Sequence, residues 1–398
     1  MKKKYLRVCK ACGKRFFTEG EKDFYKKHNL KFPSRCKKCR EIARRETSNC
    51  TEKEEPIEIE FEIIDKNDFN SNITDDALYV IGNGFDLMHG VKSSYYDFRN
   101  TLGKNNYLRI SLESFISKVD IWGDFEDSLA HIDRAAIADC LDVHLDLLDV
   151  KDEYDDDFRA SDYFMAIEQT TYPLETIEND LPKRFRHWVE KLTANNENKP
   201  LINVLNFNAD YINFNYTEFL ETLYGISSAN INYIHGNRRN KKQKLILGHG
   251  YNLDELFDNW HSNFDAKQLS ENSIARLGYF SETDSLKHWK SQTRYDATQA
   301  VISRTEDYFE CAAKKTNDII QNNKDYFKSL SKKKNIIVIG HSLSMVDYPY
   351  LKEIIITNEN PSDINWYFSF YNNKDIIRIN NFIKFAGINN NKVKVFKV

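Results

Sequence analysis

The sequence predicts an α/β fold with a mostly parallel sheet, and two observations lead to this prediction. Four short apolar runs have the length of buried strands, and each ends in a polar or glycine-bearing cluster. Helical patterns at 95–102, 218–224 and 347–356 follow three of them. Alternating strands and helices are typical of parallel sheets with right-handed crossovers. The four runs are residues 77–81, 211–214, 231–234 and 336–339.

The clusters after these runs are expected to meet at one site. In a parallel sheet the carboxyl ends of the strands share one edge, and ligands bind in the crevice there. The sequence therefore predicts a single pocket formed by four strand-end clusters. These clusters are Gly82-Asn83-Gly84-Phe85-Asp86, Asn215-Tyr216-Thr217, His235-Gly236-Asn237 and Gly340-His341-Ser342-Leu343.

Charge and length divide the chain into three parts. A chain of 398 residues exceeds what one hydrophobic core usually supports. Residues 1–45 hold 17 Lys and Arg against 4 Asp and Glu, whereas the remainder has an excess of 16 acidic residues. Residues 46–76 form an acidic linker that ends in an alternating apolar and acidic segment, which predicts an edge strand. Residues 77–398 form the main domain, with helical inserts at about 105–200 and 252–330. In the first insert, Asp180 and Pro182 predict the start of a helix.

Two C-x2-C pairs predict a small zinc module at residues 1–45. Cys9, Cys12, Cys36 and Cys39 have the spacing of a tetrahedral Zn²⁺ site, and a segment this short needs the metal to fold. We interpret it as a zinc ribbon with structural zinc. Its excess of 13 positive charges and its interleaved aromatic residues suit nucleic-acid binding. They suit a protein-docking module or a solvated basic face equally well.

Membrane insertion and export are not expected. No stretch approaches the roughly 18 uncharged apolar residues of a membrane span. The basic first residues are not followed by the apolar core of a signal peptide. A cytoplasmic protein is the simplest interpretation.

The residue types in the strand-end clusters suggest acid–base chemistry on a phosphate-bearing ligand. His235 is the first candidate for a general base. Asn215 orients a water molecule or a hydroxyl group, or else it caps a helix. Asp86 binds ribose hydroxyls or stabilises an oxocarbenium-like centre, or caps a turn. Gly82 and Gly84 let the backbone approach a phosphate, or serve a tight turn required only by packing. His341 and Ser342 contact phosphates or cap a helix.

Several ordered motifs resemble the AbiH family of bacteriophage abortive-infection proteins. They are IGNGFDLMHGVKSSYYDF at 81–98, WGDFE at 122–126, FNYT at 214–217, IHG at 234–236, LGHG at 247–250 and GHSLSMVD at 340–347. The resemblance spans roughly residues 77–395 and implies a role in antiphage defence. The cysteine-rich N-terminus resembles a family of short probable zinc-binding domains.

A more distant resemblance is to sirtuins and sirtuin-like NAD-cleaving domains. It implies a Rossmann-like sheet, NAD as substrate or ligand, a catalytic role for His235 and a place at the site for Asn215. Together with Asp86, these are the candidate catalytic residues. It also implies ligand contacts for a further set of residues. The chain departs from the sirtuin pattern at Asp86, which replaces a small hydroxyl residue, and at Thr217, where an acidic residue is usual. No zinc knuckle follows His235. The residues with implied ligand contacts are Gly82, Asn83, Gly84, Phe85, Phe98, Arg99, Gly236, Gly340, His341 and Ser342.

The expected function is an antiphage effector that binds NAD or a related nucleotide and hydrolyses it at the nicotinamide–ribose bond. The alternative is a defence module that senses a nucleotide without cleaving it. Expected partners are the nucleotide, a nucleic acid or a phage or host protein at the basic module, and a second copy of the chain. No membrane is expected.

Overall fold

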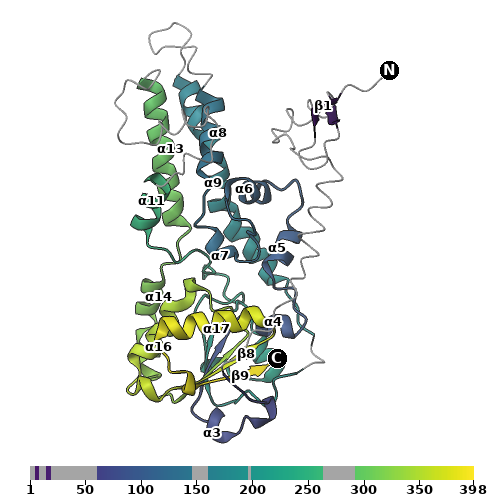
Figure 1. Cartoon of the computed structure of the whole chain (residues 1–398), viewed down its shortest axis with the longest axis vertical. Helices are drawn as coiled ribbons and strands as arrows, with labels where there is room; N and C mark the ends of the chain where they lie inside the picture. Colours follow the sequence, from purple (N-terminus) through teal and green to yellow (C-terminus); the bar gives the residue numbers. More distant parts are fainter. Residues whose placement is uncertain (1–4, 9–14, 19–60, 146–159, 196–198, 263–291) are drawn as a thin grey trace. The chain divides into compact units, whose positions relative to one another are not determined.

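The protein is described from a computed structural model, which divides into two units, residues 1–58 and 59–398. Figure 1 draws the whole chain, and the structure describes residues 5–8, 15–18, 61–145, 160–195, 199–262 and 292–398. Each unit is considered by itself. No described helix is long and apolar enough to cross a membrane.

The larger unit contains a seven-stranded, fully parallel sheet with the order β3-β9-β8-β7-β4-β5-β6. Strands β4, β5 and β6 follow one another toward one edge of the sheet, and β7, β8 and β9 follow one another toward the other edge. This is the doubly wound order of Rossmann-like folds. The predicted fold class is therefore confirmed. The strands are β3 Glu62–Ile63, β4 Leu78–Ile81, β5 Asp210–Asn213, β6 Ile231–Tyr233, β7 Asn335–Ile339, β8 Asn365–Phe370 and β9 Val393–Lys397.

The central strands are apolar because the sheet is covered on both faces. All residues of β4 and β7 are buried, as expected for strands that lie between two layers of helices. On one face, Phe382 of α17 packs its ring 5.7 Å from that of Trp366 on β8. The helices that follow strands are α4 Asn83–Met88, α10 Phe219–Tyr224, α16 Tyr348–Thr357 and α17 Asn373–Ala386.

The described residues of the two predicted inserts are mostly helical. In the first insert, α9 packs against α6 and α8, and it also packs against α13 of the second insert (Figure 1). The segment from α4 to α9 contains α5 Tyr95–Thr101, α6 Tyr107–Phe115, α7 Phe125–Ser128, α8 Arg134–Leu145 and α9 Ala160–Glu190. The second insert contains α11 Leu253–Ser262, α13 Gln292–Cys311, α14 Thr316–Asn322 and α15 Lys324–Ser329.

The predicted helix start at Asp180 and Pro182 is wrong. Both Pro182 and Pro173 lie inside the continuous helix α9. A proline in a helix costs roughly 3 kcal/mol. The neighbouring Leu174, Ile177, Leu181 and Phe185 are all buried, and their packing offsets this cost.

The smaller unit begins with a two-stranded antiparallel sheet. Strand β1 Tyr5–Val8 pairs with β2 Arg15–Thr18, and Val8 lies opposite Arg15. Cys9 and Cys12 fall between the two strands in the sequence. These two cysteines, Cys36, Cys39 and residues 46–60 of the acidic linker lie outside the described residues. Within the described part of residues 46–76, β3 forms an edge of the large sheet beside β9.

Candidate functional site

A cavity of about 690 Å³ opens at the carboxyl edge of the sheet. It includes the point between β4 and β7 where the strand order reverses, which is where doubly wound folds bind ligands. Its volume lies within the usual range for small-molecule sites. Of the residues in the four predicted clusters, those that line this cavity are Gly82, Asn83, Gly84, Asp86, Asn215, Tyr216, Thr217, His235, Gly340, His341 and Ser342.

Four residues given ligand contacts by the sirtuin resemblance do not line the cavity. Phe85 is buried against His89, and Arg99 donates from Nε to Glu113 at 2.7 Å. Phe98 lies behind the wall, with its ring 5.7 Å from that of Phe185, which does line the cavity. Gly236 has φ 89° and packs beside the segment around Lys244. Their places in the fold fit structural roles.

Close packing between two strand-end loops requires the glycines at the centre of the site. The Gly84 N–H donates to the carbonyl of Gly340 at 2.7 Å. A Cβ atom on Gly84 would lie 2.6 Å from Gly340 Cα, and one on Gly82 would lie 2.4 Å from His341 Cα. Both distances are far shorter than van der Waals contact. Close packing of the two loops is therefore enough to require glycine at positions 82 and 84.

Asp86 is held by side chains that follow the neighbouring strand β5. Asn215 donates from Nδ2 to Asp86 Oδ1 at 2.9 Å and to the carbonyl of Gly82 at 3.0 Å. Thr217 donates from Oγ1 to the other carboxylate oxygen at 2.6 Å. Burial raises the pKa of Asp86 to about 7, although both hydrogen bonds act to lower it. Near neutral pH this carboxyl group is therefore close to half protonated.

Asp86 is expected to make the folded state less stable as the pH rises from about 4 to 7. Its pKa is near 4 in an unfolded chain and about 7 in the folded one, so the folded state binds the extra proton in that window. Its stabilising contribution is complete below pH 4 and is lost as the pH approaches 7, by up to about 4 kcal/mol. Asp86→Asn should remove this loss. Urea unfolding at several pH values measures it.

The control for this experiment is Asp363→Asn, which changes a carboxylate whose side chain is 73% exposed. The difference in unfolding free energy between Asp86→Asn and the unmodified protein should grow with pH. If Asp86→Asn and the unmodified protein lose the same stability as the pH rises, Asp86 is not a buried group with a raised pKa.

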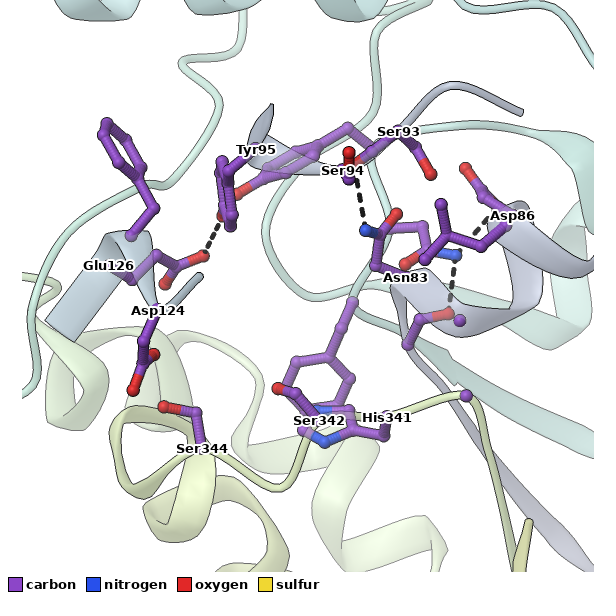
Figure 2. Close-up of a pocket in the computed structure, with 18 of the residues that line it drawn as sticks. Asn83, Asp86, Ser93, Ser94, Tyr95, Asp124, Glu126, His341, Ser342 and Ser344 are labelled. Carbon is purple, nitrogen blue, oxygen red and sulfur yellow. Dashed lines mark hydrogen bonds between the residues drawn. The ribbon is translucent and has the colours of Figure 1, made fainter. Parts of the chain in front are cut away.

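A second group of charged side chains lies on the other side of the cavity. Lys314, fully buried, contacts the Glu126 carboxylate and lies 3.1 Å from Asp347 Oδ1. The Tyr95 hydroxyl donates to Glu126 at 2.8 Å, and Figure 2 shows this pair across the cavity from Asn83 and Asp86. Burial opposes the charge on Lys314, but the two carboxylates raise its pKa above the ordinary value.

Both imidazoles of the site are held neutral. Burial lowers the pKa of His235 well below 6.5, and the charge of Lys314 lowers it further. Burial and Lys314 likewise lower the pKa of His341 to about 3. The edge of each ring packs against Phe214, with ring centroids 5.1 Å away for His235 and 4.4 Å for His341. Both neutral imidazoles also lie beside the carboxyl group of Asp347.

The comparisons with known proteins identify the two parts of the chain. The model of the family described as bacteriophage abortive infection AbiH matches residues 78–370. The chain belongs to the AbiH family. A model described as a probable treble clef domain matches residues 5–48, which contain all four cysteines of the C-x2-C pairs. No curated protein and no solved structure matches.

The treble clef match indicates a zinc-binding domain at the N-terminus. The segment predicted as a zinc ribbon is called the treble clef domain from here on. Zinc-binding domains of this size depend on the metal for their folding energy. Both suggested families, AbiH and the short zinc-binding domain, are thereby confirmed. The likeness to sirtuins stays a prediction.

The geometry gives a structural reason for the LGHG motif of this AbiH protein. The His249 N–H donates to the carbonyl of Ala312 at 3.0 Å, and the Lys314 N–H donates to the carbonyl of His249 at 2.7 Å. A Cβ atom on Gly248 would lie 2.3 Å from the oxygen of Ala312. The motif therefore fixes the backbone that presents Lys314. Sequence analysis missed Lys314 because no local pattern distinguishes it from its neighbour Lys315 or from other lysines that follow a helix.

Proposed function

We propose that this AbiH protein binds NAD or a related nucleotide in the cavity and hydrolyses its nicotinamide–ribose bond. Membership of the AbiH family gives the protein a role in bacteriophage abortive infection. The observation that carries the finer proposal is the arrangement of Asp86, Asn215 and His235. They follow three different strands and line one cavity at the carboxyl edge. This is where a doubly wound sheet holds a nucleotide.

The chemistry assigned to His235 is that of a general base. A neutral imidazole can accept a proton, and His235 Nε2 is buried with no hydrogen-bond partner among the described residues. A water molecule that attacks the ribose carbon would give up its proton there. Aromatic side chains of the cavity, among them Tyr95, Trp122 and Trp188, offer surfaces for a ring to stack on.

Asp86 would face the ribose hydroxyls, with Asn215 and Thr217 fixing its orientation. A full negative charge here would repel a pyrophosphate by roughly 1–4 kcal/mol at 4 Å. A pKa of about 7 reduces this repulsion, because a large share of the carboxyl groups are neutral at physiological pH. Asp86 is therefore compatible with an anionic nucleotide in the same cavity.

Replacing His235 with alanine is expected to lower the rate of nicotinamide release by about 10²-fold or more, the usual effect of losing an acid–base group. Purified protein is incubated with NAD, and free nicotinamide is measured by chromatography. His131→Ala is the control, because His131 is partly exposed, bonds to Asp127 and does not line the cavity. Equal rates for the unmodified protein and His235→Ala would contradict the assigned role.

The second candidate function is nucleotide sensing without cleavage. One observation favours it, namely that protein donors already occupy both oxygens of Asp86. In that case calorimetry would detect NAD binding while no nicotinamide appears. In either case we propose that the basic treble clef domain contacts the trigger, a nucleic acid or a phage or host protein, through electrostatic attraction.

A further inference from the structure

The charged group beside His235 is unbalanced. The ammonium of Lys314 faces two carboxylates, those of Glu126 and Asp347, and the Lys314 side chain is fully buried. With both histidines neutral and both carboxyl groups ionised, the group would carry one excess negative charge in a buried position, and burial accordingly raises the pKa of Glu126. Burying a net charge is costly, and taking up one proton would remove that cost.

The two imidazoles differ in their ability to take up this proton. His341 Nδ1 accepts a hydrogen bond from the Leu343 N–H at 3.0 Å, so the neutral ring carries its proton on Nε2, 3.6 Å from Asp347 Oδ2. The ring of His235 makes a backbone hydrogen bond at Phe214, and its Nε2 is unpartnered among the described residues. That atom lies 3.8 Å from Asp347 Oδ1. His235 is therefore the ring that can gain a proton and form an ion pair with Asp347.

We propose that Asp347 is the carboxylate partner of His235, held in place by Lys314, and that the His235–Asp347 pair takes up the proton released by hydrolysis. This inference rests on the proposed function. In the hydrolytic step the oxygen of water bonds to the ribose C1′ atom. The C1′–N bond breaks, and its electron pair goes to the nicotinamide ring nitrogen. The proton of the water moves to His235 Nε2.

The 3.8 Å separation suits a pair that closes when it is charged. Catalytic hydrogen bonds are often long in the free enzyme and shorten in the complex. A protonated His235 would attract Asp347 to hydrogen-bond distance, while Lys314 and His341 keep the carboxylate from turning away. Asp347 is thus a positioning residue that acts through His235.

The charges around His235 oppose one another, and this gives the proposal a distinctive signature. Asp347 favours the protonated ring, whereas burial and Lys314 disfavour it. Removing Asp347 and removing Lys314 should therefore shift the titration of His235 in opposite directions. Opposite shifts would show that both charges reach the ring, and the effect of Asp347→Asn on kcat separates a positioning role from a merely structural one. The titratable groups that face this ring are Asp347, Lys314, His341, Tyr216 and Tyr350, and Glu126 contacts Lys314 behind them.

The experiment follows His235 by NMR in the full chain with isotope-labelled histidine, which needs no enzymatic activity. Asp347→Asn should move its titration to lower pH, and Lys314→Met should move it to higher pH. Asp347→Asn should also lower kcat for nicotinamide release at least tenfold and change KM much less. A matched control pair is Lys333 and Asp210, 2.6 Å apart at the amino ends of β7 and β5. Lys333→Met and Asp210→Asn should leave the titration unchanged.

Shifts in the same direction for Asp347→Asn and Lys314→Met, or no shift in either, would overturn the pairing. If Lys314→Met does not fold, the double variant with Asp347→Asn removes one charge of each sign beside the ring. We expect its His235 titration at higher pH than that of Asp347→Asn alone, and a titration at the same or lower pH would overturn the proposal. Absence of nicotinamide release from the unmodified protein would refute the proposed hydrolysis, while the NMR titration would still decide the pairing.

Discussion

Cys36→Ser is expected to unfold the treble clef domain while the sheet domain stays folded. Structural zinc in small domains contributes roughly 10–16 kcal/mol of apparent binding free energy. A segment of this length cannot replace that contribution with a hydrophobic core. We therefore expect Cys9, Cys12, Cys36 and Cys39 to hold one zinc ion per chain. Residues 59–398 form a separate unit with its own core, and this unit should keep its stability.

Elemental analysis of the purified chain measures the zinc, and limited proteolysis measures which part unfolds. Cys311→Ser is the matched control, because Cys311 is an exposed free cysteine on α13. It should keep one zinc per chain and an intact N-terminus. A chain that carries no zinc after expression in zinc-replete medium would contradict the prediction. A Cys36→Ser variant with unchanged zinc content would contradict it equally.

The sequence was sufficient to predict the central strands of the sheet because these strands are buried on both faces. The apolar runs at 77–81 and 336–339 differ by one residue from β4 Leu78–Ile81 and β7 Asn335–Ile339. Such runs have few other stable environments in a chain of this composition. The start of α9 could not be predicted in the same way. Proline at position 182 is typical of a first turn, and only the packing of the surrounding helices overrides that preference.

The same reasoning explains which part of the site was predictable. Asp86, Asn215 and His235 follow apolar runs directly, so the topology of a parallel sheet brings them together. Lys314 follows α13 in the second insert, and Glu126 lies in α7 of the first. Their meeting depends on how the inserts pack, which is a long-range property that local patterns do not encode. Asp347 lies inside a motif of the AbiH resemblance, but its position next to His235 emerges only in three dimensions.

Replacing Gly340 with alanine should destabilise the sheet domain by about 3 kcal/mol or more. Gly340 has φ 61°, where a side chain costs roughly 1–2 kcal/mol of strain. In addition, its Cβ atom would lie 2.3 Å from the backbone nitrogen of Phe85, which a rigid loop cannot avoid. Overpacking of this kind costs typically 1–3 kcal/mol more. Urea unfolding measures the loss of stability.

Gly387→Ala separates strain from steric clash. Gly387 ends α17 with φ 67°, but a Cβ atom added there would meet no atom within 4 Å outside its own neighbourhood. Its substitution should therefore cost only the strain, roughly 1–2 kcal/mol. The difference in lost unfolding free energy between Gly340→Ala and Gly387→Ala measures the steric clash between the Gly82–Gly84 loop and the Gly340 loop. If both variants lose the same stability, the close approach of the β4 and β7 ends does not exist, and the cavity built on it would have a different shape.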